Sequence, residues 1–97
     1  CNERYYSGAN AAEQYTIPIA PGALGVYKYS YDHWDVKDRA RIYLNGRLIE
    51  DTQCTGGEKN IELSVSEGGQ FTIIIDPFCD PKPSETITEW NFKLSCP

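Results

Sequence analysis

The chain has 97 residues and a formal net charge of −5 at pH 7, which fits one small acidic domain over residues 1–97. Its nine Lys and Arg residues are scattered, so the sequence lacks the basic stripe that binding to nucleic acid or an anionic membrane surface requires. No apolar run approaches the roughly 18 residues of a membrane-spanning helix, which argues against membrane insertion.

Apolar and polar side chains alternate along most of the chain, a period of two that is typical of β-strands. Pro18 lacks a backbone N–H, so the first strand is expected at a sheet edge. Asn45-Gly46 between two strands favours a tight hairpin, because both turn positions need a positive φ. We expect strands at 14–19, 24–31, 39–44, 47–52, 59–65, 70–76 and 88–95, and a Pro-rich loop at 76–86.

Turn signals recur about every 8–12 residues, a rhythm typical of all-β sandwiches and barrels. The predicted fold is an antiparallel β-sandwich, jelly-roll or immunoglobulin-like, with about seven or eight short strands. Tyr5 and Tyr6 lie in a polar segment to which the pattern assigns no element. The alternation predicts these inward side chains: Tyr27, Tyr29, Tyr31, Ala40, Ile42, Leu44, Ile61, Leu63, Val65, Phe71, Ile73, Ile75, Trp90, Phe92 and Leu94.

The four cysteines, Cys1, Cys54, Cys79 and Cys96, lie far apart in the sequence. This spacing indicates two disulfides in an oxidising compartment rather than a zinc site, and therefore a secreted or cell-surface protein. Three pairings are possible, and we favour Cys1–Cys96, which would join the chain ends, with Cys54–Cys79, which would join two loops. An acylated N-terminal cysteine, as in a lipoprotein, is an alternative that would leave an odd thiol.

Several short motifs occur in a characteristic order over residues 24–97. They are Tyr31-Asp32, Lys37-Asp38-Arg39, Asn45-Gly46, Asp51-Thr52-Gln53-Cys54, Thr88-Glu89-Trp90-Asn91-Phe92 and Cys96-Pro97. In this order they resemble a small, disulfide-bonded extracellular module appended to bacterial, phage and fungal surface or secreted proteins. The resemblance implies a β-sandwich and no particular activity, and Cys79 looks like the module's second cysteine. Gln53 stands where the module has Gly, and Ile87 stands where it has Gly or another small residue. The loops around these two residues are therefore expected to differ from those of the module.

Asp32, Asp35 and Asp38 are spaced by three in the segment 31–39. Calcium takes six to eight oxygen ligands, so three carboxylates near one turn are candidate metal ligands. The alternative is structural, because Asp side chains stabilise turns through nearby backbone amides and because Asp38 has Arg39 beside it as an ion-pair partner.

The candidate ligand-binding residues are His33, Trp34, Asp35 and Phe78, all outside the predicted strands. An exposed Trp34 could stack on a sugar ring or anchor a protein partner. It could equally fold over the end of the core. His33, the only histidine, is expected on the surface of its loop, and Phe78 is a weaker case of the same kind.

No motif pairs a nucleophile with a general base, and so small a domain rarely forms a deep cleft, so we expect no enzymatic activity. The favoured function is a non-catalytic extracellular recognition or adhesion module that binds a glycan or a cell-surface protein through its loops, with calcium as a candidate cofactor. One alternative is a structural cap, spacer or fibre-tip domain. Another is a secreted effector or toxin fragment that binds a host protein.

Overall fold

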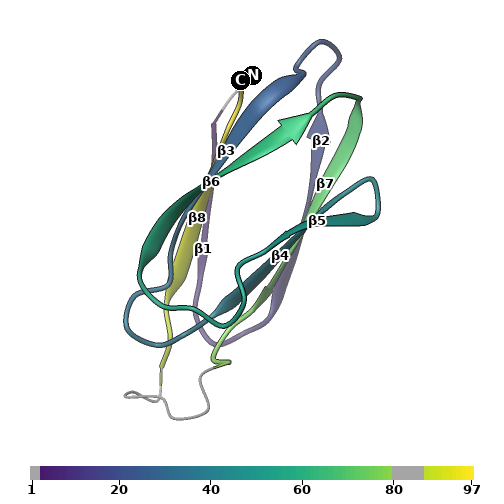
Figure 1. The fold of residues 1–97 in the computed structure, drawn as a ribbon. Coiled ribbons are helices and arrows are strands. Elements are labelled where there is room, and N and C mark those ends of the chain that lie inside the picture. Colours follow the sequence, from purple (N-terminus) through teal and green to yellow (C-terminus); the bar gives the residue numbers. More distant parts are fainter. Residues whose placement is uncertain (1–2, 80–86) are drawn as a thin grey trace.

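The computed structural model describes residues 3–79 and 87–97, which form two antiparallel four-stranded sheets packed face to face (Figure 1). The predicted all-β sandwich is confirmed. The first sheet has the order β1 (Arg4–Gly8), β8 (Trp90–Ser95), β3 (Gly25–Asp32) and β6 (Glu58–Val65). The second sheet has the order β2 (Glu13–Ile19), β7 (Gly69–Asp76), β4 (Arg39–Leu44) and β5 (Arg47–Asp51). Within the described ranges there is no helix, and so none that is long and apolar enough to cross a membrane.

The strand order is that of a jelly roll. Strands β1, β2, β3 and β4 pair antiparallel with β8, β7, β6 and β5 respectively, so the chain behaves as one long hairpin folded into two layers. The tip of that hairpin is Asn45-Gly46, with φ of 51° and 83°, as the turn chemistry predicts. The Asn45 side chain also accepts a hydrogen bond from Gln70 N and donates one to Gly68 O, which attaches the tip to the start of β7.

The core lies between the two sheets and matches the inward pattern expected from the sequence. Ile61 is half-buried, and every other predicted core residue is buried. The largest of these side chains are Trp90 and Phe92 on β8 and Tyr29 on β3, in the middle of the first sheet, together with Phe71 on β7 in the second. Stacked ring contacts link the three in the first sheet, such as the Tyr29–Phe92 pair with centroids 5.0 Å apart, and Phe71 meets Tyr27 edge to face.

Strand β1 is the element that the alternation did not predict. Tyr6 turns inward, where its ring lies 4.3 Å from that of Tyr15 and 5.1 Å from that of Phe92. Gly8 is required at the end of the strand, because a Cβ there would collide with the indole of Trp90. β2 lies at a sheet edge, as Pro18 predicts, and β8 begins at Trp90, two residues later than expected.

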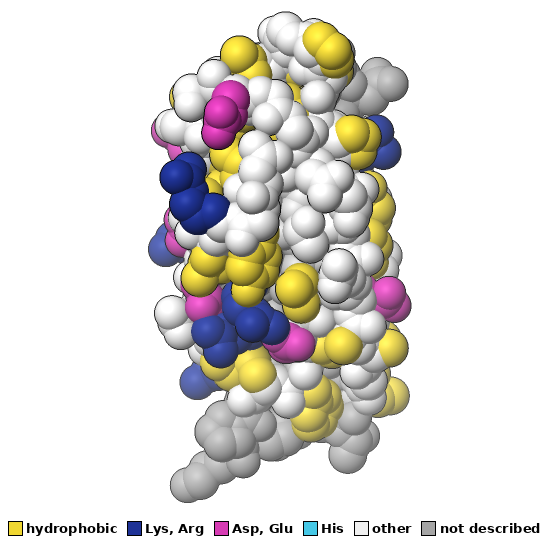
Figure 2. Space-filling model, turned by 90° about the vertical axis from the view of Figure 1, so that its right-hand side faces the viewer, with side chains coloured by type: hydrophobic (Ala, Val, Ile, Leu, Met, Phe, Trp, Pro, Cys, Tyr) yellow, Lys and Arg dark blue, Asp and Glu magenta, His cyan; other side chains and the backbone are white. Residues whose placement is uncertain are grey.

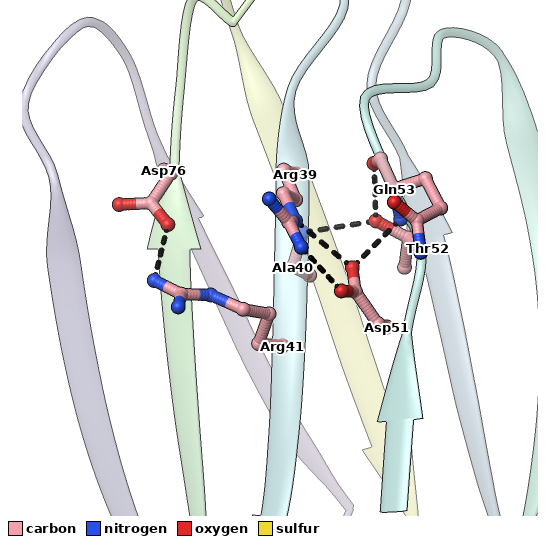
Figure 3. Close-up of polar contacts among 7 residues, drawn as sticks. All are labelled: Arg39, Ala40, Arg41, Asp51, Thr52, Gln53 and Asp76. Carbon is pink, nitrogen blue, oxygen red and sulfur yellow. Dashed lines mark hydrogen bonds and ion pairs between the residues drawn. The ribbon is translucent and has the colours of Figure 1, made fainter. Parts of the chain in front are cut away.

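The outer face of the second sheet carries ion pairs between neighbouring strands. Figure 2, which looks at the molecule from this side, shows Lys and Arg side chains with Asp and Glu beside them. Arg39 on β4 binds Asp51 on β5 through two hydrogen bonds of 3.0 and 2.5 Å, and Arg41 binds Asp76 on β7 at 2.6 Å (Figure 3). The expectation that Arg39 pairs with Asp38 is therefore wrong, because Arg39 points outward while Asp38 is buried.

A disulfide joins Cys54, after β5, to Cys79, after β7, with the two Cα atoms 5.9 Å apart. This confirms one of the two predicted bridges, and it links loops that follow two different strands of the second sheet. Cys1, and with it the predicted Cys1–Cys96 bridge, lies outside the described residues, as does most of the Pro-rich loop.

Candidate functional site

Four segments from three connections meet at the lower end of the sandwich in Figure 1, and we call this region the loop end: residues 33–38, 52–57, 77–79 and 87–89. Backbone hydrogen bonds hold the connections together, from His33 N to Gly57 O at 2.8 Å and from Cys79 N to Lys37 O at 3.1 Å. The Cys54–Cys79 disulfide adds a covalent link between two of them. All four residues predicted to bind a ligand belong to this region.

His33 is buried, with 1% of its surface exposed, so the prediction of a surface histidine is wrong. Its Nδ1 lies 2.9 Å from Thr55 O, and its ring centroid is 4.3 Å from that of Tyr31. Burial lowers the pKa of His33, although the Thr55 carbonyl and nearby Asp38 and Asp32 oppose the shift. His33 therefore supports the loop from beneath and presents nothing to a ligand.

Asp38 is also fully buried, in the interior of the loop end. Its carboxylate accepts a hydrogen bond of 2.8 Å from Phe78 N and further bonds, the shorter of 2.8 Å, from the hydroxyl of buried Thr88. Burial raises the pKa of Asp38, and these donors limit the rise because they favour the ionised form. Asp38 thus joins segments 33–38, 77–79 and 87–89 from the inside.

The three aspartates proposed for calcium are not brought together. Asp38 is engaged in the interior, Asp32 accepts a hydrogen bond of 2.8 Å from Trp34 N, and Asp35 is exposed. In the part of the chain that the structure describes, no three His, Cys, Asp or Glu side chains form a group that could hold a metal ion. The placement agrees with the structural interpretation of these carboxylates and does not support the predicted calcium shell.

Trp34 and Asp35 are the two predicted residues that face solvent at the loop end. Trp34 is 45% exposed and has a φ of 50°, a left-handed conformation that is rare for a bulky residue. Its N–H binds Asp32, and its carbonyl accepts a bond of 2.7 Å from Gly57 N. Beside it is a hollow of about 210 Å³, here named the Trp34 pocket, lined by Trp34, Asp35, Val36, Ile87, Thr88 and Glu89.

Phe78 does not line the Trp34 pocket. It is half-buried, with a φ of 59°, and its amide is held by buried Asp38. Ile87, in contrast, is 59% exposed and completes the apolar part of the pocket. The sequence had marked Ile87 only as an unusual loop residue.

A second, larger hollow of about 540 Å³ lies on the outer face of the first sheet, and we call it the sheet groove. The strand register places Tyr5, Lys93, Ser30 and Asn60 in one row across β1, β8, β3 and β6. The next row contains Asn91, Asp32 and Glu58. The apolar half of the alternation does not reveal this site, because the groove is built mainly from the polar half.

No protein-family model matches this chain, and no curated protein matches it either.

Proposed function

We propose that this domain is a non-catalytic extracellular recognition module that docks a protein partner through the Trp34 pocket. The observation that carries the proposal is an exposed tryptophan held in a left-handed conformation beside a hollow. A bulky residue in this conformation costs on the order of 1–3 kcal/mol and persists only where its surroundings hold it, and such strain concentrates at functional sites. The disulfide is consistent with secretion.

The rigidity of the loop end supports a docking role. Both backbone polar groups of Trp34 are hydrogen-bonded: its N–H donates to the Asp32 carboxylate, and its carbonyl accepts from Gly57 N. Beneath it, Asp38 ties Phe78 and Thr88 to the same region. A preorganised aromatic anchor loses little conformational entropy on binding, which is why Trp is enriched among the residues that dominate protein interfaces.

The chemistry of the pocket favours a basic side chain from the partner. Trp34 and Ile87 supply apolar surface, while Asp35 and Glu89 place two carboxylates on the same lining. A Lys or Arg inserted here would meet the indole face and both anionic groups. The net charge of −5 adds long-range attraction for a basic partner surface.

The proposal is tested by selecting peptides from a random display library on the wild-type domain, with removal of those that also bind Trp34→Ala. We expect the enriched peptides to carry Lys or Arg, and their affinity to fall at least about tenfold in Asp35→Asn or Glu89→Gln. Their affinity should also fall as salt rises, because the charges are close to solvent. Trp34→Ala should leave the melting temperature nearly unchanged.

Two results would contradict the proposal. The first is a selection in which no peptide distinguishes the wild-type domain from Trp34→Ala. The second is a tight homotrimer by sedimentation whose interface buries Trp34, which would favour the structural cap or fibre-tip alternative. A selection dominated by peptides without basic residues would show that the pocket has been assigned the wrong chemistry.

A further inference from the structure

We propose that the sheet groove binds a neutral oligosaccharide. This site is separate from the Trp34 pocket and takes a different class of ligand, so the inference goes beyond the docking function proposed above. It rests on the dimensions of the groove, on asparagine side chains without hydrogen-bond partners among the described residues, on charges of both signs, and on backbone groups that are already used within the sheet.

The groove extends across the whole sheet. Its first row runs from Tyr5 on β1 to Asn60 on β6, the two edge strands. With neighbouring strands about 4.8 Å apart, three such steps span about 14 Å. A hollow of about 540 Å³ with this width suits a chain of several sugar rings better than a single ring.

The groups along this path match what a sugar presents. Tyr5 is 63% exposed, and its ring offers a flat face to the C–H side of a pyranose. Asn60 and Asn91 line the groove, and no hydrogen bond within the described residues uses their side chains. Each amide has two N–H donors and one acceptor oxygen, a set that pairs with adjacent sugar hydroxyls.

The groove carries charges of both signs. In its two rows Lys93 lies near two acidic residues, Asp32 and Glu58, while the register places Lys59 opposite inward-facing Tyr31. Lys93 also has Glu3 at 3.6 Å, so its charge is partly compensated already. An acidic glycan or a nucleic acid would be repelled by the two carboxylates, and a basic chain by the Lys93 ammonium group, whereas a neutral ligand meets neither repulsion.

A peptide is a poor occupant of this surface. The strands at its centre, β8 and β3, have neighbours on both sides, so their backbone N–H and C=O groups are used within the sheet. A peptide could not add to them as a further strand. Recognition therefore depends on side chains that stand up from the sheet, which suits a ligand covered with hydroxyl groups.

The inference is tested by calorimetric titration of the full chain with neutral hexasaccharides of glucose, mannose and N-acetylglucosamine, and with polygalacturonate and heparin fragments as acidic probes. We expect at least one neutral hexasaccharide to bind. Tyr5→Ala should weaken that binding at least about tenfold and Asn91→Ala by about tenfold, while Tyr5→Phe, which keeps the ring, should stay within about threefold. Because Tyr5 is mostly exposed, Tyr5→Ala should keep the wild-type melting temperature.

Tyr43→Ala, on the outer face of the other sheet, is the matched control and should bind the sugar as the wild type does. Trp34→Ala should do the same, which separates this test from that of the docking proposal. The inference is overturned if no neutral hexasaccharide binds at millimolar concentration, if only the acidic probes bind, or if Tyr5→Ala binds as tightly as Tyr5→Phe.

Discussion

Three tyrosines of one strand differ in whether their buried hydroxyl groups have hydrogen-bond partners. Tyr27, Tyr29 and Tyr31 all point inward from β3. The Tyr27 hydroxyl donates to Ala23 O at 2.7 Å, and that of Tyr31 lies 3.4 Å from Thr55 Oγ1. The Tyr29 hydroxyl is buried without a partner among the described residues, and burial raises its pKa. An unsatisfied buried hydroxyl keeps its desolvation cost without gaining a bond.

We therefore expect Tyr29→Phe to leave the free energy of unfolding within about 0.5 kcal/mol of the wild type or to increase it. Tyr27→Phe, which removes a hydroxyl that does have an acceptor, should lower it by about 1 kcal/mol. Urea denaturation followed by tryptophan fluorescence measures both. A loss of stability in Tyr29→Phe as large as that in Tyr27→Phe would mean that the Tyr29 hydroxyl is hydrogen-bonded in solution.

A second residue-level feature concerns three of the four described non-glycine residues at positive φ, the fourth being Asn45 in its hairpin turn. Trp34, Gln53 and Phe78 each have an amide that donates to an aspartate carboxylate, respectively that of Asp32, Asp51 and Asp38. Two of these aspartates lie two residues upstream, as in a local turn, while Asp38 reaches Phe78 across forty positions of sequence. The local pairs follow a familiar turn chemistry, but the third depends on the finished fold.

At the scale of elements, prediction succeeded where the pattern was local. The hairpin at Asn45-Gly46, the edge position of Pro18 and nearly all of the inward residues could be read from spacing alone, because alternation and turn chemistry act within a few residues. Strand β1 could not, because its pairing with β8 and the contacts of Tyr6 join opposite ends of the chain. For the same reason the burial of His33 was missed, since the groups that cover it, such as Thr55, lie in other connections.

The residues of the candidate sites also divide into those that a local pattern predicts and those that only the finished fold brings together. Trp34 and Asp35 could be predicted because aromatic and acidic residues outside strands are distinctive. Ile87 could not be joined to them, since only the packing of two connections brings it to the same pocket. The sheet groove needed the register of four strands, which no local pattern contains.

The connection that contains His33 should make the fold sensitive to mild acid. Burial lowers the pKa of His33 below its ordinary value of 6.5. As the pH falls below 6.5, His33 is therefore protonated more readily in the unfolded chain than in the folded one. The stability that His33 contributes is complete above pH 6.5 and is lost as the pH falls through the lowered pKa. Asp38 acts in the opposite direction, because its raised pKa stabilises the folded state as the pH falls through that value.

We expect the free energy of unfolding to fall between about pH 6.5 and pH 5 in the wild type, and to change less in His33→Gln over the same range. Denaturation curves at several pH values measure the slope. Asp38→Asn is the matched variant, and it should steepen the slope, because the Asp38 carboxylate opposes the lowering of the His33 pKa. Equal slopes in the wild type and in His33→Gln would show that His33 is protonated as easily in the folded chain as in the unfolded one.

At the scale of the whole molecule, the two-layer arrangement leaves four edge strands: β1 and β6 in the first sheet, and β2 and β5 in the second. Open edges invite pairing with a second copy of the chain. On β6 the residues Glu58, Lys59 and Glu62 put charges along the edge, and on β2 Pro18 removes one N–H. Charged side chains and a proline on an edge strand both disfavour edge-to-edge pairing of sheets.

Pro18 is the device that can be tested most cleanly. It is exposed and faces outward between the buried Ile17 and Ile19, so Pro18→Val should leave the core intact. The change restores a backbone donor on the open edge of β2 and adds a residue that favours strands, which promotes pairing of two copies along this edge. We therefore expect the weight-average mass in sedimentation equilibrium to rise with concentration more steeply than in the wild type. Thr72→Val, which makes a similar apolar change on β7 between two other strands, should not have this effect, because an interior strand has no free edge. Equal masses for Pro18→Val and Thr72→Val at every concentration would mean that the β2 edge is protected by its remaining side chains rather than by the missing amide.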